Sequence, residues 1–323
     1  KIVIEKETAL LQTVKERGYL VCGVNSGLPG FASEDEEGNW SGLDVDFCRA
    51  VSAAVFGDAD KVEYLGLNAA QRFPTLASGS IDILSRNTTW TISRDVNLMF
   101  EFAGVSYYDG QGFLVPAALG ITSARGLDGA FVCIASETTS ELNLNDYFAE
   151  NNMAYRPIYV EGNKDAKAKL FAGECDVFTT DASGLASARA GAENPDDWVV
   201  LPEIISKEPL GPLVRQGDQE WEDVVRWTLF AMINAEEMGI TSRNVDDMLA
   251  AQSKEIKRLL GVEGYMGPML GLGMKFGYNI IKQVGNYGES FNKHIGPGTP
   301  LNLERGLNNL WNNGGILYVP PFR

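Results

Sequence analysis

The sequence predicts an α/β protein made of two lobes, each with a mainly parallel β-sheet flanked by helices. From residue 19 onward, short apolar runs alternate with stretches of helical periodicity, which is the pattern of βαβ units. A second series of the same kind begins near residue 111. The chain of 323 residues is also longer than a single small core requires, so two lobes are the expected arrangement.

The first series of elements lies between residues 19 and 84. We expect strands at residues 19–24, 61–65 and 81–84, and helices at 44–55 and 73–77. The second of these helices would carry Pro74 in its first turn and Gly79 at its carboxyl end, where each residue type is favoured.

The second series predicts an inserted lobe. We expect strands at residues 112–115, 131–134, 155–159, 176–180 and 198–201, and helices at 140–150, 165–171 and 182–190. After these, the chain offers a strand at 210–214, helices at 220–238 and 245–260, and a Gly-rich tail.

The chain therefore divides into lobe 1, residues 1–110 plus 205–323 with a C-terminal helical extension, and lobe 2, residues 111–204. Ligands bind outside the carboxyl ends of the strands in such sheets, so a cleft between the lobes is expected. The crossing segments, 110–115 and 206–210, would form a two-strand hinge, because a closing protein absorbs its backbone rotations where the chain crosses.

Composition and charge exclude several classes of protein. With 45% hydrophobic and 22% charged residues, the chain is neither disordered nor fibrous. Its 27 Lys and Arg against 43 Asp and Glu give a net charge of −16, which argues against binding nucleic acid or anionic lipid. No apolar run approaches the roughly 18 residues that a membrane span needs.

Polar residues follow the strand at 81–84. Asn87, Thr89 and neighbouring hydroxyl groups supply hydrogen-bond donors at the carboxyl edge of the sheet. Arg94 adds a planar fork suited to a carboxylate. This run predicts an anion clamp, and the alternative is a Ser/Thr-rich loop with a solvated Arg.

Two strand ends in the inserted lobe carry further polar groups. Thr138 and Thr139 begin a helix, so they form either an anion-binding helix N-terminus or an ordinary N-cap box. Asp181 either caps the next helix or points its carboxylate into the cleft. Together with Arg94, these groups match both charged ends of an amino-acid zwitterion.

Several segments of the sequence resemble those of a known family. Residues 42–47, 82–94 and 173–181 look like those of the polar amino-acid solute-binding proteins of ATP-driven importers, family 3 of the solute-binding proteins. The tail at residues 278–291 and 300–323 resembles the general L-amino-acid-binding branch. The resemblance implies a periplasmic-binding-protein-like fold of type II and a receptor of broad specificity that delivers L-amino acids to an ABC permease.

The resemblance also implies roles for single residues. Arg94, in a Thr-x-Thr-x-x-Arg pattern, would hold the ligand α-carboxylate, assisted by Thr89 and the backbone near Asn87, where the family usually has Gly. Asp181 would be the acid of the second lobe, and residues 136–140, with Thr138 and Thr139, its helix-terminal loop.

We expect the part of the pocket that contacts the ligand side chain to lack a fixed counter-charge for one class of side chain. Asn25 stands where relatives that prefer cationic ligands place an acid. Trp90 either packs on variable ligand side chains or belongs to the core. Arg86 either favours acidic ligands or faces solvent.

The sequence offers little support for a metal site, a nucleotide-binding site or an enzyme active site. His294 is the only histidine, the cysteines lack C-x-x-C spacing, and no Gly-x-Gly-x-x-Gly or Walker loop follows the first strand, so we expect no metal and no cofactor. The rival from another class is a periplasmic dehydratase or lyase on the same scaffold, with Glu137 as general acid. The alternative is that Glu137 lies in the first turn of a helix, where its negative charge interacts favourably with the helix dipole.

We expect a periplasmic monomer, because the chain does not begin with Met, is acidic and resembles importer receptors. Such a compartment permits disulfides. Cys22 and Cys48 fall on a strand and on the inward face of the next helix, and Cys133 and Cys175 on strands that should be near neighbours. We predict one disulfide in each lobe, Cys22–Cys48 and Cys133–Cys175, with buried free thiols as the alternative.

Overall fold

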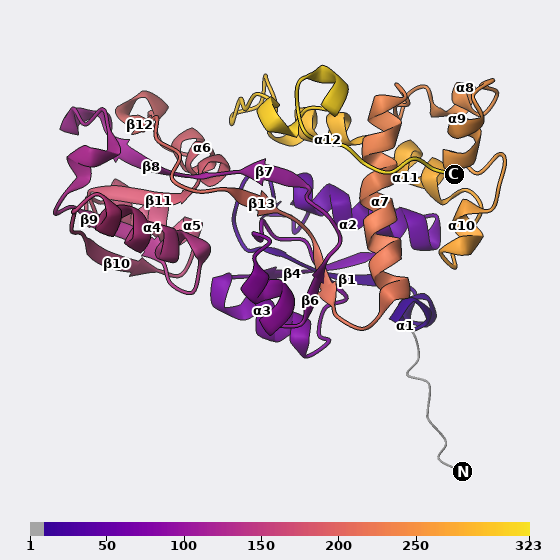
Figure 1. Ribbon diagram of the computed structural model, residues 1–323, viewed down its shortest axis with the longest axis horizontal. Coiled ribbons are helices and arrows are strands. Elements are labelled where there is room, and N and C mark those ends of the chain that lie inside the picture. The colour runs from indigo at the N-terminus through magenta and orange to yellow at the C-terminus, as the bar shows by residue number, and fades with distance from the viewer. Residues whose placement is uncertain (1–9) are drawn as a thin grey trace, which may run out of the picture.

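The computed structural model describes residues 10–323, and two five-stranded sheets form the centres of its two lobes (Figure 1). The sheet of lobe 1 has the order β4-β1-β5-β14-β6. Its strands are β1 (Leu20–Asn25), β4 (Val62–Leu67), β5 (Ile83–Leu84), β6 (Phe100–Phe102) and β14 (Leu213–Arg215). The sheet of lobe 2 has the order β10-β9-β11-β8-β12. Its strands are β8 (Gln111–Pro116), β9 (Phe131–Ala135), β10 (Arg156–Val160), β11 (Val177–Asp181) and β12 (Trp198–Val200).

Both sheets follow one plan. In lobe 1, β1 pairs in parallel with β4 and β5, whereas β14 is antiparallel to both of its neighbours. In lobe 2, β9 pairs in parallel with β10 and β11, whereas β8 is antiparallel to both of its neighbours. Four of the five strands in each sheet therefore point the same way. The expected fold class, two mainly parallel sheets flanked by helices, is confirmed.

Two paired strands connect the lobes, and Figure 1 shows them running side by side between the two sheets. They are β7 (Tyr107–Asp109) and β13 (Glu208–Leu210), which pair antiparallel. The first crossing segment was expected at 110–115, and this placement is wrong, because most of that range is β8, the central antiparallel strand of lobe 2. A second short ribbon in lobe 1 pairs β2 (Ser33–Glu34) with β3 (Trp40–Ser41).

Helices surround both sheets, and two of the expected helices differ from the structure by a turn or more. Lobe 1 has α1 (Leu10–Arg17), α2 (Leu43–Phe56), α3 (Ala69–Ala77) and α7 (Gln219–Glu237); lobe 2 has α4 (Thr139–Glu150), α5 (Asn163–Phe171) and α6 (Ala182–Ala190). Helix α3 begins one turn earlier than expected, because Asn68 and Gln71 form a capping box that places Pro74 inside the helix. The expected helix at 245–260 is two helices, α8 (Val245–Met248) and α9 (Lys254–Leu259).

The C-terminal extension continues with α10 (Met266–Met269), α11 (Phe276–Gln283) and α12 (Tyr287–His294). Its side chains Phe276, Ile280 and Phe291 are buried in the same hydrophobic cluster as the strands and helices of lobe 1. The extension is therefore an integral layer of lobe 1. In Figure 1 it lies beside α7 and reaches toward the crossing strands.

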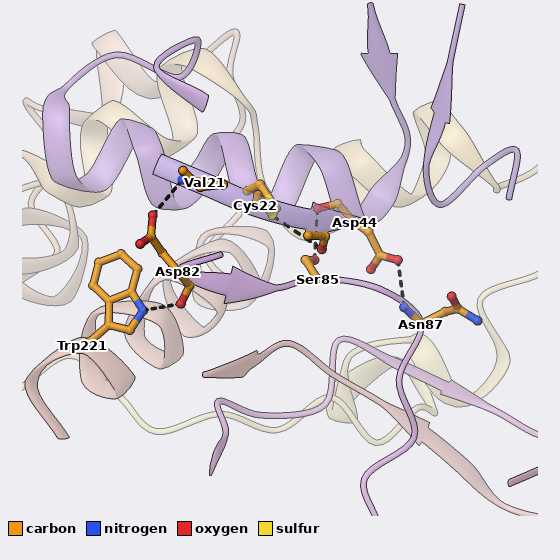
Figure 2. Close-up of a disulfide and its surroundings, with 9 residues drawn as sticks. Val21, Cys22, Asp44, Asp82, Ser85, Asn87 and Trp221 are labelled. Atoms are coloured by element: carbon orange, nitrogen blue, oxygen red, sulfur yellow. Dashed lines mark hydrogen bonds between the residues drawn. A yellow bond between two sulfur atoms is a disulfide. The ribbon is translucent and has the colours of Figure 1, made fainter. Parts of the chain in front are cut away.

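Both expected disulfides are present. Cys22 on β1 joins Cys48 on α2, with 6.4 Å between their Cα atoms (Figure 2). Cys133 on β9 joins Cys175, which lies just before β11, with 5.7 Å between their Cα atoms. Each bridge lies within one lobe, so neither restrains the crossing strands.

Candidate functional site

A narrow polar pocket lies where the carboxyl ends of strands from the two sheets face each other. Residues from lobe 1 line one wall: Asn25, Ala69, Arg72, Arg86, Asn87, Thr89 and Arg94. Residues from lobe 2 line the other: Ala135, Thr138, Thr139, Ser140, Gly162, Asn163, Thr180 and Asp181. Seven of the eight residues expected to bind ligand are in these two sets.

The lobe 1 wall is built on the segment that leaves β5. Asn87 has a left-handed φ of 22°, a conformation that Asn tolerates better than most residues. Its backbone N–H donates to the Asp44 carboxylate at 3.0 Å, and Figure 2 shows this contact. Its side-chain oxygen accepts from Asn25 Nδ2 at 2.9 Å. Asp44, on the first turn of α2, thus fixes the loop that presents Asn87.

Arg94 lies on a short π-helical turn, Ser93–Asn97, and its side chain is buried. Its Nη1 donates to the Thr89 carbonyl at 2.8 Å, which orients the guanidinium. Burial lowers the pKa of Arg94, although the nearby carboxylates of Glu208 and Asp181 oppose this effect. The remaining donors of a buried guanidinium favour an anionic partner, and the wall of the pocket is where such a partner can reach them.

Asp181 occupies the N-cap position of α6 but makes no capping hydrogen bond with its side chain. Of the two sequence interpretations, the structure therefore supports the carboxylate that faces the cleft. Its Oδ2 accepts from Asn87 Nδ2 at 3.3 Å, a contact between the two lobes. Burial raises the pKa of Asp181 well above its usual range, and the neighbouring carboxylates of Asp109 and Glu208 add to the rise. An ammonium group in the pocket would favour the charged form.

Thr138 is the N-cap residue of α4, and it also lines the pocket. Its Oγ1 accepts from the Glu141 N–H at 3.3 Å and donates to the Ala135 carbonyl at 2.7 Å. Thr139, the first residue of α4, approaches Thr89 of the other lobe, with 3.3 Å between their hydroxyl oxygens.

Glu208 holds the two threonines from the crossing strand β13. Thr89 Oγ1 donates to its carboxylate, and Thr139 Oγ1 donates to the same oxygen at 3.0 Å. Asn143 on α4 donates to the other oxygen at 2.7 Å. Sequence reasoning missed Glu208, because a single Glu in a crossing segment gives no signal of the buried groups that converge on it.

Two arginines complete the lobe 1 wall. Arg86 was expected either to favour acidic ligands or to face solvent; it is buried, lines the pocket and donates from Nε to the Leu67 carbonyl at 2.9 Å. Burial lowers its pKa to about 10. Arg72 on α3 was missed, because a lone Arg on a helix that begins earlier than expected resembles a solvated side chain.

Trp90 is the expected site residue that the structure places elsewhere. It does not line the pocket, and 39% of its surface is exposed. Its ring stacks on Phe102 with centroids 5.2 Å apart, and its Nε1 donates to Asp95 at 2.7 Å. Successive residues of a loop point in different directions, and here Thr89 turns inward while Trp90 turns out. The structure therefore places Trp90 outside the pocket lining.

Glu137, the general acid of the enzyme alternative, is exposed and lies outside the pocket lining. Its backbone N–H donates a hydrogen bond to the Glu141 carboxylate in the first turn of α4, at 3.0 Å. Within residues 10–323, no cluster of three or more His, Cys, Asp or Glu is arranged to hold a metal ion. In the same range no helix has the length and apolar character that crossing a bilayer requires.

Comparison with known proteins agrees with this geometry. Residues 20–243 match the family described as bacterial extracellular solute-binding proteins, family 3. The chain belongs to this family. The match includes both sheets and every pocket residue named above.

Relatives of high similarity span nearly the whole chain. It is 56% identical over 315 residues to the general L-amino acid-binding periplasmic protein of Rhizobium johnstonii, covering 97% of this chain and 92% of that protein. It is 52% identical to the glutamate/glutamine/aspartate/asparagine-binding protein of Rhodobacter capsulatus, covering 97% and 93%. A solved periplasmic binding protein from Brucella ovis with glutathione bound has 53% identity and a TM-score of 0.96, covering 98% of this chain and all of that one.

Proposed function

We propose that this protein is an extracytoplasmic receptor that captures L-amino acids between its lobes and delivers them to an ABC permease. The observation that carries the proposal is the pair of buried charges on opposite walls of the pocket, Arg94 on lobe 1 and Asp181 on lobe 2. An amino-acid zwitterion presents an α-carboxylate to the first and an α-ammonium to the second. The relatives named above support a periplasmic location and an importer as the partner.

We propose that residues 1–110 plus 205–323 and residues 111–204 move as two bodies about the strands β7 and β13, and that the receptor acts as a monomer. Ligand that touches both lobes binds the closed arrangement preferentially, and this difference in affinity drives closure. The contacts Asn87–Asp181 and Thr89–Thr139 support the same view, since both join the lobes beside the pocket.

Broad specificity follows from the way the lining is divided. The zwitterion clamp is common to all L-amino acids, whereas Asn25 carries no fixed charge and can donate or accept. A second pocket of about 450 Å³ shares Asn25, Gly162 and Asn163 with the first and leaves room for longer ligands. The glutathione in the Brucella ovis relative has a γ-glutamyl end with the same α-amino and α-carboxylate groups. We therefore propose that γ-glutamyl peptides belong to the ligand range.

The enzyme alternative predicts a chemically altered ligand, and the receptor predicts an unchanged one. The test incubates the protein with all twenty L-amino acids, removes free ligand, denatures the protein and identifies what it releases by mass spectrometry. Release of unmodified L-amino acids supports the receptor. Release of a dehydrated or deaminated product would support the enzyme, and release of nothing would contradict both.

A further inference from the structure

Glu208 lies on the crossing strand β13 and carries a buried carboxylate between the two lobes. The residue is 1% exposed, pairs with Asp109 of β7 and does not line the pocket. Burial lowers the pKa of Arg94 and the Glu208 carboxylate opposes this effect, so the two charges lie close to each other. A buried carboxylate is costly unless nearby charges and hydrogen bonds compensate it. The hydrogen bonds that Glu208 accepts therefore determine where it is stable.

Hydrogen bonds from both lobes converge on this carboxylate. Thr89 of lobe 1 and Thr139 of lobe 2 both donate from their hydroxyl groups to Oε2, the second at 3.0 Å. Asn143 of lobe 2 and Ser206, two residues before Glu208, both donate to Oε1 at 2.7 Å. Each oxygen thus accepts two hydrogen bonds, and lobe 2 supplies one of the two on each oxygen.

The lobe 1 side of this network is fixed to the crossing strand itself. Thr89 pairs with Leu210 of β13 in an isolated antiparallel bridge. The next residue, Trp90, donates from its backbone N–H to the Pro209 carbonyl at 2.8 Å. A rotation of the lobes about the crossing strands would therefore leave Thr89 beside Glu208.

The lobe 2 side is fixed to the other sheet. Gln111 of β8 donates to the Ser140 carbonyl of α4 at 2.9 Å and accepts from Asn143 of the same helix at 3.0 Å. Helix α4 therefore moves with lobe 2. The same rotation would carry Thr139 and Asn143 away from Glu208, and each carboxylate oxygen would lose one of its donors.

The direct contact between the two threonines also depends on Glu208. A hydroxyl group has one hydrogen to donate. While Thr89 and Thr139 both donate to Glu208, the 3.3 Å approach of their oxygens contains no hydrogen bond of its own. The shared carboxylate is therefore what joins the lobes at this point.

We infer that Glu208 is a positioning residue that stabilises the closed arrangement of the lobes and slows the release of every bound L-amino acid, without contacting the ligand. This inference rests on the proposed function, because it concerns the closure that captures the ligand. Ligand enters the open arrangement, in which α4 is separated from Glu208, so association does not depend on these hydrogen bonds. Release requires opening, which breaks them.

The experiment measures association and dissociation rates by stopped-flow tryptophan fluorescence for the wild type, Glu208→Gln and the control Glu203→Gln. The probes are L-glutamine and L-asparagine, whose side chains are uncharged, so the loss of one negative charge from the protein acts on both alike. Glu203 accepts from Ser123 at 2.6 Å within lobe 2 and lies outside the pocket, so the control removes the same charge.

Glu208→Gln replaces one accepting oxygen by an amide nitrogen, so donors from the lobes lose an acceptor. We expect the dissociation rates of both probes to rise by at least about tenfold, because the closed arrangement loses hydrogen bonds to a charged group. Association rates should stay within about threefold of the wild type. Both rates of Glu203→Gln should stay within about twofold of the wild type.

Unchanged dissociation in Glu208→Gln would overturn the inference, because a role in stability alone leaves the folded fraction releasing ligand at the normal rate. Faster release of only one probe would overturn it too, since this outcome indicates contact with the ligand side chain. Slower association with unchanged dissociation would place the effect before closure and would also contradict it. If neither probe binds the wild type, the proposed function itself fails.

A second variant covers the case in which Glu208→Gln does not fold. Asn143→Ala removes a lobe 2 donor at a half-buried position outside the pocket, and it should raise both dissociation rates by about threefold or more. Asn145→Ala, at an exposed position on the same helix, is its control and should leave them within about twofold. Equal dissociation rates of Asn143→Ala and Asn145→Ala would contradict the inference.

Discussion

Arg94 should be indispensable for binding, because its guanidinium is buried and the ligand carboxylate would be left without a partner in its absence. We expect Arg94→Ala to weaken L-amino acid binding by about 2–5 kcal/mol, which is a loss of roughly thirtyfold or more in affinity. Calorimetric titration with L-glutamine measures it. Arg189→Ala is the control, since that side chain is 44% exposed and lies outside the pocket.

An affinity of Arg94→Ala within about tenfold of the wild type would contradict the clamp. If Arg189→Ala weakened amino-acid binding as much as Arg94→Ala, the loss would reflect the removal of a positive charge in general.

The buried carboxyl of Asp44 should make stability depend on pH. Burial raises its pKa from 3.8 to about 6, so the native state holds this proton more tightly than the unfolded chain. The stability that this bound proton gives to the native state is therefore complete below the pKa of the unfolded chain. It is lost as the pH rises through about 6. Relative to Asp44→Asn, which does not titrate, the wild type should lose on the order of 3 kcal/mol between pH 4 and 7.5.

Chemical denaturation of both proteins across this pH range measures the difference. A difference in the free energy of unfolding that stays constant with pH, or that grows in favour of the wild type as pH rises, would show that Asp44 is ionised throughout.

The sequence predicted the pocket residues that directly follow strands, and it missed the pocket residues that do not. Asn87, Thr89 and Asp181 could be found because the carboxyl ends of parallel strands meet at one edge of a sheet. Arg72 lies on a helix and Glu208 on a crossing strand, so neither position implied a shared pocket. Trp90 was misplaced, because the direction of a side chain in a loop depends on backbone angles that the sequence does not show.

Among the elements, the lobe 2 disulfide ties the start of β11 to β9. The Cys133–Cys175 bridge spans 42 residues and both cysteines are buried. Replacing both by Ala should lower the free energy of unfolding by about 2–4 kcal/mol, since the unfolded chain regains the conformations that the loop excludes. Neither cysteine lines the pocket, so ligand affinity should stay within about threefold of the wild type. Unchanged stability by urea denaturation, or a large loss of affinity, would contradict this.

The C-terminal extension supports the crossing strand β7. Asn308 donates from Nδ2 to the Tyr108 carbonyl at 3.0 Å and accepts from the Tyr108 N–H at 2.6 Å. Asn308→Ala leaves both backbone groups without these partners and should lower the free energy of unfolding by about 2–4 kcal/mol. Asn312→Ala, at an exposed position four residues on, is the control and should change it by less than about 0.5 kcal/mol. Equal stabilities of the two variants by denaturant titration would show that these bonds contribute nothing.

The sequence placed most strands and helices well, because alternating buried strands and amphipathic helices leave a clear periodicity. It failed where a local signal was overlooked or absent. The Asn68–Gln71 capping box marks the start of α3. The prediction placed this start one turn too late, because it took Pro74 as a residue of the first turn. The C-terminal extension was expected to be helical and to belong to lobe 1, but the bounds of α11 and α12 and their packing could not be predicted, since this packing depends on partners distant in sequence.

For the whole molecule, the two-lobed plan could be predicted from two series of strands and helices, whereas the geometry between the lobes could not. The register of β7 against β13 and the contacts Asn87–Asp181 and Thr89–Thr139 depend on how the lobes meet. These contacts bring the two charges of the clamp to opposite walls of one pocket. We therefore expect one ligand zwitterion to join the two lobes.

A crystal structure of the complex with L-glutamate tests this claim most directly, because it locates both α-groups at once. We expect the α-carboxylate within hydrogen-bond distance of the Arg94 guanidinium and the α-ammonium within hydrogen-bond distance of the Asp181 carboxylate, at roughly 2.7–3.2 Å in each case. A ligand whose α-groups contact only one lobe, or contact neither of these two side chains, would contradict it.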